Sequence, residues 1–238
     1  MTEPRPVNPI EAAILAGEDH PPLTKKERMG LSRVSMPEQD AVLRATNFRE
    51  VNLGLTWQLA MLEAERCLEC PKPYCIDGCP VRVNIPRFIR LVRDGDIQAA
   101  AESLLDDNAL PCVTGRVCPQ ESQCEGVCLR AKTGKSVAIG SLERYVADWA
   151  NTHADQLPRH RPALNGRTVA IVGSGPAGLT AAGELAKLGY EVTIFEAFHA
   201  PGGVLIYGIP EFRLPKDIVQ AEVDRLVEAG VRIEPNSI

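Results

Sequence analysis

The sequence lacks three features that would each point to a different class of protein. None of its apolar runs approaches the roughly twenty residues that a helix needs to span a bilayer. Aromatic residues make up 5% of the chain and the net charge is −5, so neither base stacking nor electrostatic attraction favours nucleic acid or an anionic membrane. Residues 1–18 contain one basic residue, Arg5, and no apolar run of signal-peptide length. We therefore expect a cytoplasmic protein with no nucleic-acid or membrane partner.

Cysteine, in contrast, is abundant, with eight residues in the chain. The first group falls within thirteen positions and a proline follows it: Cys67, Cys70, Cys75, Cys79 and Pro80. A second group lies about forty residues on: Cys118, Cys124 and Cys128. In two-cluster ferredoxins, the fourth cysteine of such a run binds the other cluster. The spacing therefore predicts two iron–sulfur clusters, the first held by Cys67, Cys70 and Cys75 and the second by Cys79, with the remaining ligands supplied by the second group.

Zinc and disulfide bonds are the two alternatives for so many cysteines. Structural zinc commonly uses paired C-x2-C units, and Cys67 with Cys70 forms the only such pair in the sequence. Disulfides need an oxidising compartment, which nothing at the N-terminus indicates. Iron–sulfur spacing is favoured over both.

Residues 37–150 show the spacing of amphipathic helices around the cysteines. Leu55, Leu59 and Leu62 lie three to four residues apart, and Thr56 is a candidate N-cap for a helix that leads into Cys67. Further helices are expected from Asn84 to Gly95, from 97 to 105 and from residue 140 or 141. Residues 37–150 are thus predicted to form a small all-α domain whose core is partly replaced by inorganic clusters. Residues 1–36, polar and broken by prolines, are predicted to be an N-terminal arm that lies against a partner subunit or a partly ordered tail. Residues 151–167 are predicted to be a linker.

Beyond the linker the pattern changes to alternating strands and helices. Thr168–Val172 is a predicted buried strand, and a G-x-G-x-x-G turn follows at once with Gly173, Gly175 and Gly178. A helix to Leu188, a strand over 191–195 and the acidic residue Glu196 complete the dinucleotide fingerprint. The glycines permit the tight turn and close approach of the pyrophosphate, the helix N-terminus offers free N–H groups, and Glu196 can accept from ribose hydroxyls.

This fingerprint alone does not separate FAD from NAD. The glycine-rich loop that follows contains Gly203, and its Arg213 offers a fork for a phosphate or a flavin carbonyl. A helix from 215 to 229 and a strand over 231–234 end the sequence. Three strands are few for a doubly wound sheet, so we expect residues 168–238 to be the first part of a Rossmann-like FAD-binding domain, and the sequence to be the front part of a longer protein. The predicted fold class is α+β overall, an N-terminal all-α iron–sulfur domain followed by the first βαβ part of a Rossmann-like domain.

Taken together, the motifs resemble the small (beta) subunit of NADPH-dependent glutamate synthase. Its relatives include the N-terminal region of dihydropyrimidine dehydrogenase and the large subunit of NADH-dependent ferredoxin:NADP oxidoreductase. The resemblance covers about residue 36 to the end. It rests on the two cysteine groups, on Gly115-Arg-Val-Cys118-Pro-Gln, Ile139-Gly-Ser-Leu-Glu143-Arg-Tyr and the glycine turn, and on Tyr207-Gly-Ile-Pro-Glu-Phe-Arg213-Leu-Pro.

The resemblance implies a particular set of ligands. By family pattern the first [4Fe–4S] cluster takes Cys67, Cys70, Cys75 and Cys128, and the second takes Cys79, Cys118, Cys124 and Glu143. Counting cysteines alone would instead choose Cys112 as the eighth ligand, and this alternative stays open at the level of sequence. FAD is implied to lie over Gly173, Gly175, Gly178, Glu196, Gly203 and Arg213, with Val117 placing the nearby cluster loop against the flavin.

The implied function is electron transfer in glutamate biosynthesis. In the family, electrons pass from NADPH through FAD and the two clusters to the active site of a partner, which is the glutamate synthase large subunit or an equivalent electron-accepting subunit of a hetero-oligomer. The NADPH site is expected to lie outside this sequence. Alternatives are an iron–sulfur relay or assembly module without its own NADPH oxidation, part of a ferredoxin:NADP oxidoreductase or of dihydropyrimidine dehydrogenase, or a zinc-binding interaction protein. No Ser/His/Asp or Cys/His nucleophile arrangement is evident, so no catalytic side chain is predicted.

Overall fold

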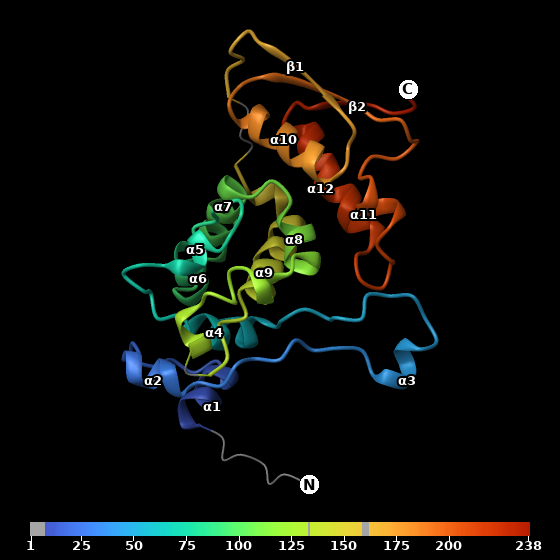
Figure 1. Ribbon diagram of the computed structural model, residues 1–238. Helices are drawn as coiled ribbons and strands as arrows, with labels where there is room; N and C mark the ends of the chain where they lie inside the picture. Colours follow the sequence, from blue (N-terminus) through green and yellow to red (C-terminus); the bar gives the residue numbers. More distant parts are fainter. Residues whose placement is uncertain (1–7, 133, 159–161) are drawn as a thin grey trace.

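A computed structural model describes residues 8–132, 134–158 and 162–238 of the chain. The fold is α+β, as the sequence predicts. A helical domain forms the lower and middle part of the molecule in Figure 1, and a parallel sheet with its helices forms the upper part. None of the helices within the described ranges is long and apolar enough to cross a membrane.

The N-terminal segment packs against the helical domain of its own chain, so the prediction of an extended arm is wrong for its described part, residues 8–36. It forms α1 (Pro9–Ala16) and α2 (Lys25–Gly30). Ile14, Leu31 and Val34 are buried in the same core as the helices that follow. The average composition of this segment is polar, so it does not reveal these three apolar side chains. The free energy gained by burying them offsets the conformational entropy lost when the segment becomes ordered. Residues 1–7 of the predicted arm lie outside the described residues.

Five main helices build the helical domain. They are α4 (Trp57–Glu65), α6 (Ile85–Arg93), α7 (Ile97–Asp107), α8 (Pro111–Val117) and α9 (Ile139–Thr152), with the short α3 (Ala41–Arg44) and α5 (Tyr74–Asp77) between them. Phe88, Val92, Leu104, Leu142 and Val146 are completely or almost completely buried between these helices. One apolar stripe per helix thus encloses a core beside the cysteine loops.

The helix caps explain why these segments begin where they do. As predicted, Thr56 accepts a hydrogen bond from the Leu59 amide (3.3 Å), and Asp96 accepts one from the Ala99 amide (3.0 Å). Asn84 precedes α6 but makes no side-chain cap. Its own amide donates to Asp107 Oδ2 (2.8 Å), which ties the start of α6 to the end of α7.

The upper part is a three-stranded parallel sheet in the order β1-β2-β3. The strands are β1 (Thr168–Val172), β2 (Glu191–Phe195) and β3 (Arg232–Glu234), with Val172 paired to Phe195 and Phe195 to Glu234. The connecting helices are α10 (Pro176–Lys187), the short α11 (Val204–Tyr207) and α12 (Lys216–Glu228).

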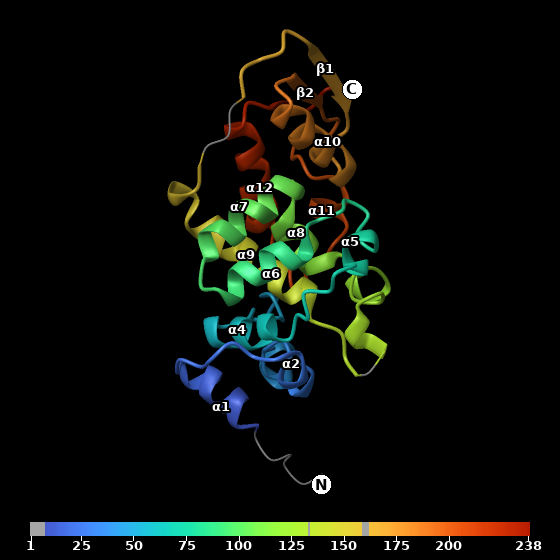
Figure 2. The same cartoon turned by 90° about the vertical axis from the view of Figure 1, so that its left-hand side faces the viewer.

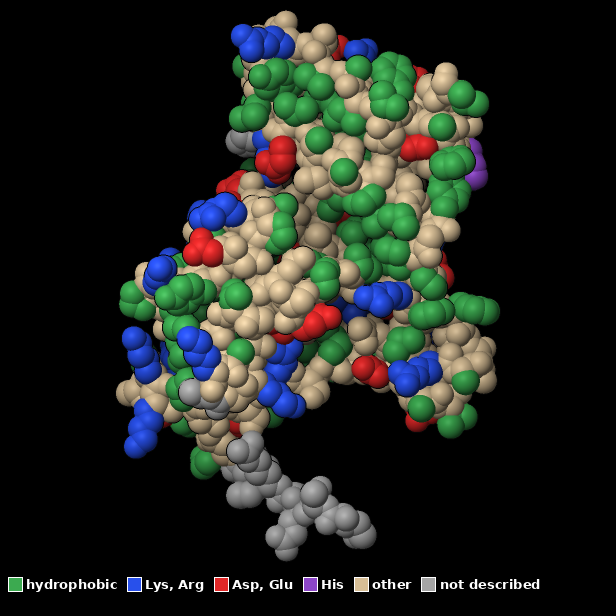
Figure 3. Space-filling model, in the orientation of Figure 1, with side chains coloured by type: hydrophobic (Ala, Val, Ile, Leu, Met, Phe, Trp, Pro, Cys, Tyr) green, Lys and Arg blue, Asp and Glu red, His purple; other side chains and the backbone are tan. Residues whose placement is uncertain are grey.

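The sheet is covered on one face. α10 and α12 lie between the sheet and the helical domain in both views (Figures 1 and 2), and Val192 and Ile194 are buried against them. On the opposite face Val172 is 91% exposed and Phe195 40%. Within the described residues β1 pairs with β2 alone. This half of the sheet is therefore apolar and open, and hydrophobic side chains are plentiful over this part of the molecule in Figure 3.

The two parts of the molecule are joined through α8. Leu110, which precedes α8, and Val113 within it belong to the hydrophobic cluster of the C-terminal part (residues 168–238, hereafter the nucleotide-binding part), together with Leu179 and Val223. The Cys112 amide also donates a hydrogen bond to Glu222 Oε1 of α12 (2.6 Å). The predicted linker is partly ordered, because α9 continues to Thr152 and a 3-10 turn follows. Its residues 159–161 lie outside the described ranges.

Candidate functional site

Four cysteines from the two groups line one cavity: Cys67, Cys70, Cys75 and Cys128. α4 ends just before Cys67, and α5 carries Cys75. Cys128 reaches the same cavity from the second group, about fifty residues later in the chain. The remaining wall is mainly apolar and is formed by side chains such as Ile85, Ile89, Val137 and Ile139. We refer to these four cysteines as the first set.

Burial controls the protonation of the first set. It raises the pKa of Cys67 to about 11, with Cys70 and Cys128 adding to the effect, and raises the pKa of Cys75 to about 12, with Cys67 and Cys128 adding to it. Each added charge would repel the next because the thiols are close. The metal-free Cys67 and Cys75 thiols are therefore protonated at neutral pH, and a metal must displace these two protons when it binds.

A second set brings together three further thiols and one carboxyl group: Cys79, Cys118, Cys124 and Glu143. Burial raises the pKa of Cys118 to about 11, with contributions from Glu143 and Cys79. Burial also raises the pKa of Cys124, to which Glu125, Glu143, Cys79 and Cys118 contribute in turn. Cys118 and Cys124 each therefore lie within electrostatic range of Cys79 and Glu143.

The Glu143 carboxyl group is held in a defined position. Its Oε1 atom accepts hydrogen bonds from Thr114 Oγ1 (2.5 Å) and Asn108 Nδ2 (2.9 Å). Burial raises the pKa of Glu143 to about 7, and these two hydrogen bonds oppose that rise. Glu143 can thus supply a carboxylate oxygen to a metal without a large further cost of ionisation.

Cys112 lies elsewhere. It is buried in α8, and its thiol donates a hydrogen bond to the Ala147 carbonyl (3.3 Å). Burial raises the pKa of its thiol, and the charged groups that act on it are Glu222, Arg225, Asp148 and Arg116. The surroundings of Cys112 are therefore those of the junction with α12, whereas Glu143 interacts electrostatically with Cys118 and Cys124.

The two sets differ from a site for a single metal ion. No three His, Cys, Asp or Glu side chains of the described residues converge closely enough to hold one ion. A single zinc needs every ligand atom about 2.0–2.3 Å from one point. A four-iron cluster instead binds each ligand at a different corner, so its thiolates surround a cavity. The first set has this form.

Three buried arginines lie near the first set, and no pattern in the sequence predicts them. Arg66 pairs with Glu63 and donates to the carbonyls of Ser136 (2.9 Å) and Lys135 (2.7 Å). Arg28 pairs with Glu65 (3.2 Å) and donates to the Cys67 carbonyl (2.9 Å). Arg130 follows Cys128 by two residues and lines the cavity. From sequence alone, an arginine next to a cysteine loop is expected to be exposed. These arginines are buried because the N-terminal segment folds over the cysteine loops.

The glycine turn after β1 has the geometry that its sequence predicts. Gly173 adopts φ +90°, which favours glycine, and a side chain at Gly178 would approach the Gly173 carbonyl oxygen to 2.0 Å. Gly175 precedes α10, and no side chain caps that helix. The first N–H groups of α10 are therefore available to an anion such as a pyrophosphate.

Glu196, which sequence places on a ribose, is engaged within the protein. Its Oε2 accepts from the Ser174 amide (2.8 Å) and hydroxyl, and its Oε1 accepts from the Phe198 amide (2.8 Å). Although burial alone would raise it, the pKa of Glu196 is lowered by these hydrogen bonds. A carboxylate has about four acceptor positions, so it keeps capacity for a ribose hydroxyl.

The other predicted cofactor residues lie around the same turn or next to it. Gly203 adopts φ +53°, and a side chain there would meet Gly175 Cα at 2.9 Å. Val117, at the end of α8, packs against the hydrophobic cluster of the nucleotide-binding part, which places the second set close to that part. Arg213 is exposed in the loop before α12. That loop is held by Lys216, whose ammonium group donates to the carbonyls of Leu205 (2.8 Å) and Leu214 (3.2 Å).

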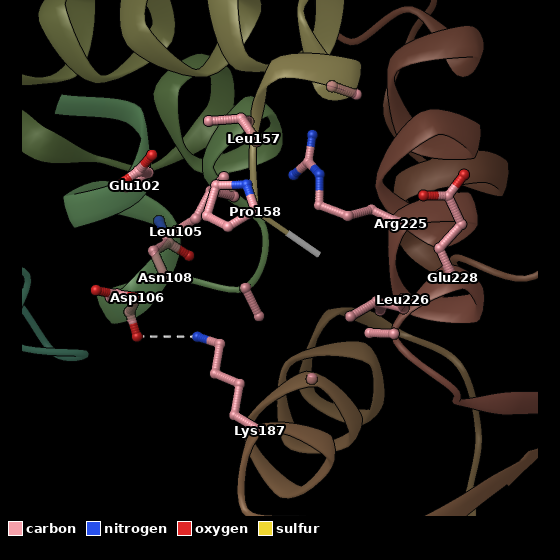
Figure 4. Close-up of a pocket in the computed structure, with 14 residues that line it drawn as sticks. Glu102, Leu105, Asp106, Asn108, Leu157, Pro158, Lys187, Arg225, Leu226 and Glu228 are labelled. Atoms are coloured by element: carbon pink, nitrogen blue, oxygen red, sulfur yellow. Dashed lines mark hydrogen bonds between the residues drawn. The ribbon is translucent and has the colours of Figure 1, made fainter. Parts of the chain in front are cut away.

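A separate pocket of about 250 Å³ lies at the junction between α7, α10 and α12 (Figure 4). Glu102 and Asn108 line it from α7, while Lys187 and Arg225 line it from α10 and α12. The Lys187 ammonium group donates to the Asp106 carbonyl across it (2.9 Å). None of the residues predicted for the clusters or the dinucleotide lines this pocket. The pocket is therefore a feature of the junction between the two parts and is separate from both predicted sites.

Comparison with known families matches the two parts separately. The family described as dihydropyrimidine dehydrogenase domain II, 4Fe-4S cluster, matches residues 44–155. The family described as NAD(P)-binding Rossmann-like domain matches residues 171–211. These two matches indicate a 4Fe-4S domain followed by a Rossmann-like nucleotide-binding part, in the same order as the helical domain and the sheet of the structure.

The chain is similar to two groups of curated proteins. It is 39% identical to the glutamate synthase [NADPH] small chain of Azospirillum brasilense, over 84% of this chain and 42% of the relative. It is 41% identical to the NAD-dependent dihydropyrimidine dehydrogenase subunit PreT of Salmonella typhimurium, over 79% of this chain and 45% of the relative. The glutamate synthase [NADPH] small chain of Escherichia coli is 36% identical, over 87% of this chain and 44% of that protein. The predicted resemblance to the glutamate synthase small subunit and its relatives is confirmed, and the chain spans less than half the length of these proteins.

Proposed function

We propose that the chain is the iron–sulfur and flavin-binding part of an NAD(P)H-dependent oxidoreductase of the glutamate synthase small-subunit type. The observation that supports the proposal is the cavity that four cysteines of the two groups line, namely Cys67, Cys70, Cys75 and Cys128. Bound there, [4Fe–4S] clusters would accept and donate single electrons.

The residues of each set have distinct tasks in holding a cluster. In the first set Cys67, Cys70, Cys75 and Cys128 would supply four thiolates from the wall of a mainly apolar cavity. In the second set Glu143 replaces a fourth thiolate, and Asn108 and Thr114 orient its carboxylate. All eight groups must release a proton to bind iron, except where Glu143 is already ionised.

The nucleotide-binding part supports FAD as the cofactor that lies nearest to the clusters. The turn from Gly173 to Gly178 and the N-terminus of α10 would hold the pyrophosphate, Glu196 the ribose, and Gly203 and Arg213 the rest of the cofactor. Val117 packs against this part and also precedes Cys118, so of the two sets the second would be the nearer to the flavin. Electrons would leave toward a partner subunit, for which the glutamate synthase large subunit or an equivalent acceptor is proposed.

Metal and flavin analysis of one anaerobic preparation tests the proposal. Iron and acid-labile sulfide at about eight per chain, together with FAD, would support it. Zinc without sulfide would overturn the cluster assignment.

A second candidate is an iron–sulfur relay or assembly module that holds clusters without a working flavin. The open face of the sheet, with Val172 and Phe195 exposed, favours this candidate because a dinucleotide held by three strands is only partly enclosed. Iron and sulfide without flavin in the same preparation would select it.

A further inference from the structure

Arg130 carries the strongest unexplained feature of the described residues. Its side chain is almost fully enclosed, with the residue 6% exposed, and it lines the cavity of the first set together with Cys128. Its two terminal nitrogens donate to the carbonyls of Arg28, Met29 (3.4 Å) and Leu31 (2.9 Å). Its Nε–H group is buried and has no hydrogen-bond partner among the described residues.

A buried N–H donor without an acceptor is rare in folded proteins, and each instance calls for an explanation. Here the guanidinium group cannot turn to find an acceptor elsewhere, because three carbonyls of the N-terminal segment fix its plane. The other two arginines nearby provide a contrast. Arg66 Nε donates to the Leu31 carbonyl (3.3 Å), and the guanidinium group of Arg28 is engaged by Glu65 and the Cys67 carbonyl. The free donor thus coincides with the one arginine that lines the cysteine cavity.

We propose that Arg130 Nε–H donates a hydrogen bond to a sulfur atom of the group bound by the first set, either a Cys128 thiolate or a sulfide of the cluster. This inference rests on the proposed function and extends it. Arg130 is a positioning and tuning residue, and the N-terminal segment is the part of the chain that holds it in place.

The physical consequence is a higher reduction potential for the first cluster. A reduced cluster carries one more negative charge, which a nearby cation and an N–H donor stabilise more than the oxidised form. The second set has a carboxylate in place of a thiolate and no arginine of this kind among its described contacts. Arg130 would therefore help to make the first set the more easily reduced of the two, which favours electron flow toward it.

Arg130→Lys separates the hydrogen bond from the charge, because lysine keeps the cation and places a methylene group where the Nε–H was. Arg66→Lys is the matched control, since Arg66 is equally buried and lies in the same network but does not line the cavity. Both variants and the wild type would be purified anaerobically as the full chain, assayed for iron and sulfide, and titrated potentiometrically with electron paramagnetic resonance detection. The signal that disappears in Cys75→Ala identifies the first cluster.

In Arg130→Lys we expect the first cluster alone to become harder to reduce, by roughly tenfold in the equilibrium constant, which is about 59 mV for one electron. Arg66→Lys leaves both potentials unchanged. An unshifted first cluster in Arg130→Lys, with iron and sulfide retained, overturns the inference and leaves the proposed function standing. A wild-type chain without iron and sulfide overturns the proposed function itself.

A measurement on the wild type keeps the inference testable if Arg130→Lys does not fold. Protein labelled with ¹⁵N at the arginine ε position would be reduced and examined by electron spin echo envelope modulation. A nitrogen coupling to the reduced first cluster is expected from a direct N–H···S contact. Its absence would mean that water satisfies the Arg130 Nε and would overturn the inference.

Discussion

The two sets of candidate ligands differ in their ligand types and in the side chains around them. The first set has four thiols in an apolar cavity, and buried arginines of the N-terminal segment and the cysteine loops surround it. The second set has three thiols and Glu143, and its surroundings are the polar side chains Asn108 and Thr114. The second set also lies beside α8, which joins the nucleotide-binding part. The two sets therefore differ in their surroundings: arginines lie near the first set, whereas the second set lies beside the junction with the nucleotide-binding part.

This difference teaches that ligand identity alone does not define the two sites. Cluster potential depends on net charge, on hydrogen bonds to sulfur and on exposure. Positively charged side chains lie near the first set, whereas in the second set a carboxylate takes the place of one thiolate. The following changes would break or sharpen that contrast.

The largest effect is expected from removing a thiol of the first set. Cys75→Ala removes one of the four proposed thiolate ligands, so the first cluster should be lost and the iron content should fall to about half. The measurement is iron and sulfide per chain after anaerobic purification. Cys112→Ala is the control and should keep its full iron content. Equal iron loss in both variants would contradict the division into two sets.

A change at Glu143 tests the second set directly. Glu143→Ala should deplete the second cluster and leave the first, because no other oxygen ligand replaces the carboxylate. Glu143→Cys should restore iron by making the second set resemble the first, and should shift the potential of that cluster. Iron analysis and redox titration of both variants give the answer. Full iron in Glu143→Ala together with loss in Cys112→Ala would reassign the eighth ligand to Cys112.

The arginine network predicts a large stability effect confined to the neighbourhood of the first set. Arg66→Met leaves the fully buried Glu63 carboxylate without its ion-pair partner, so the free energy of unfolding should fall by about 3–5 kcal/mol. Urea unfolding followed by circular dichroism would measure it. Arg232→Met removes an exposed pair with Glu191 and should cost less than about 1 kcal/mol. Similar losses in both variants would show that burial of the network is not what matters.

The smallest effect is expected at the support of Glu143. Asn108→Ala removes the donor to Glu143 and the acceptor of the Leu110 amide (3.0 Å), which should lower the free energy of unfolding by about 1–3 kcal/mol. It should also broaden or shift the spectrum of the second cluster and leave that of the first unchanged. Asn47→Ala, at a half-buried position in the loop after α3, is the control, because it also removes side-chain hydrogen bonds but lies outside both sets. A changed first-cluster spectrum in Asn108→Ala would contradict the separation of the two sets.

Much of this fold could be predicted from the sequence, because the signals were local. The cap at Thr56, the strand–turn–helix at 168–188 and the glycine turn depend on neighbouring residues alone. The spacing of Cys67, Cys70 and Cys75 likewise placed them together and set Cys79 apart. The structure has the same local elements.

What sequence spacing missed depends on contacts between distant segments. The Arg130 guanidinium group is held by carbonyls of residues 28–31, about a hundred positions earlier in the chain. No periodic pattern in the sequence predicts this contact. Glu143 was suggested by family resemblance, since a glutamate within a helix normally reads as a solvated side chain. The N-terminal segment was misjudged because a few buried residues, such as Leu31, decide its packing while its average composition is polar.

The open edge of β1 has a consequence for how the protein behaves in concentrated solution. An unpaired parallel edge beside exposed Val172 and Phe195 is a template for pairing with another chain. The tendency of the protein to self-associate would then depend on the nucleotide-binding part, even though the helical domain contains the reactive thiols. A light-scattering signal that grows with protein concentration and persists in thiol reductant would trace self-association to strand pairing rather than to disulfide exchange.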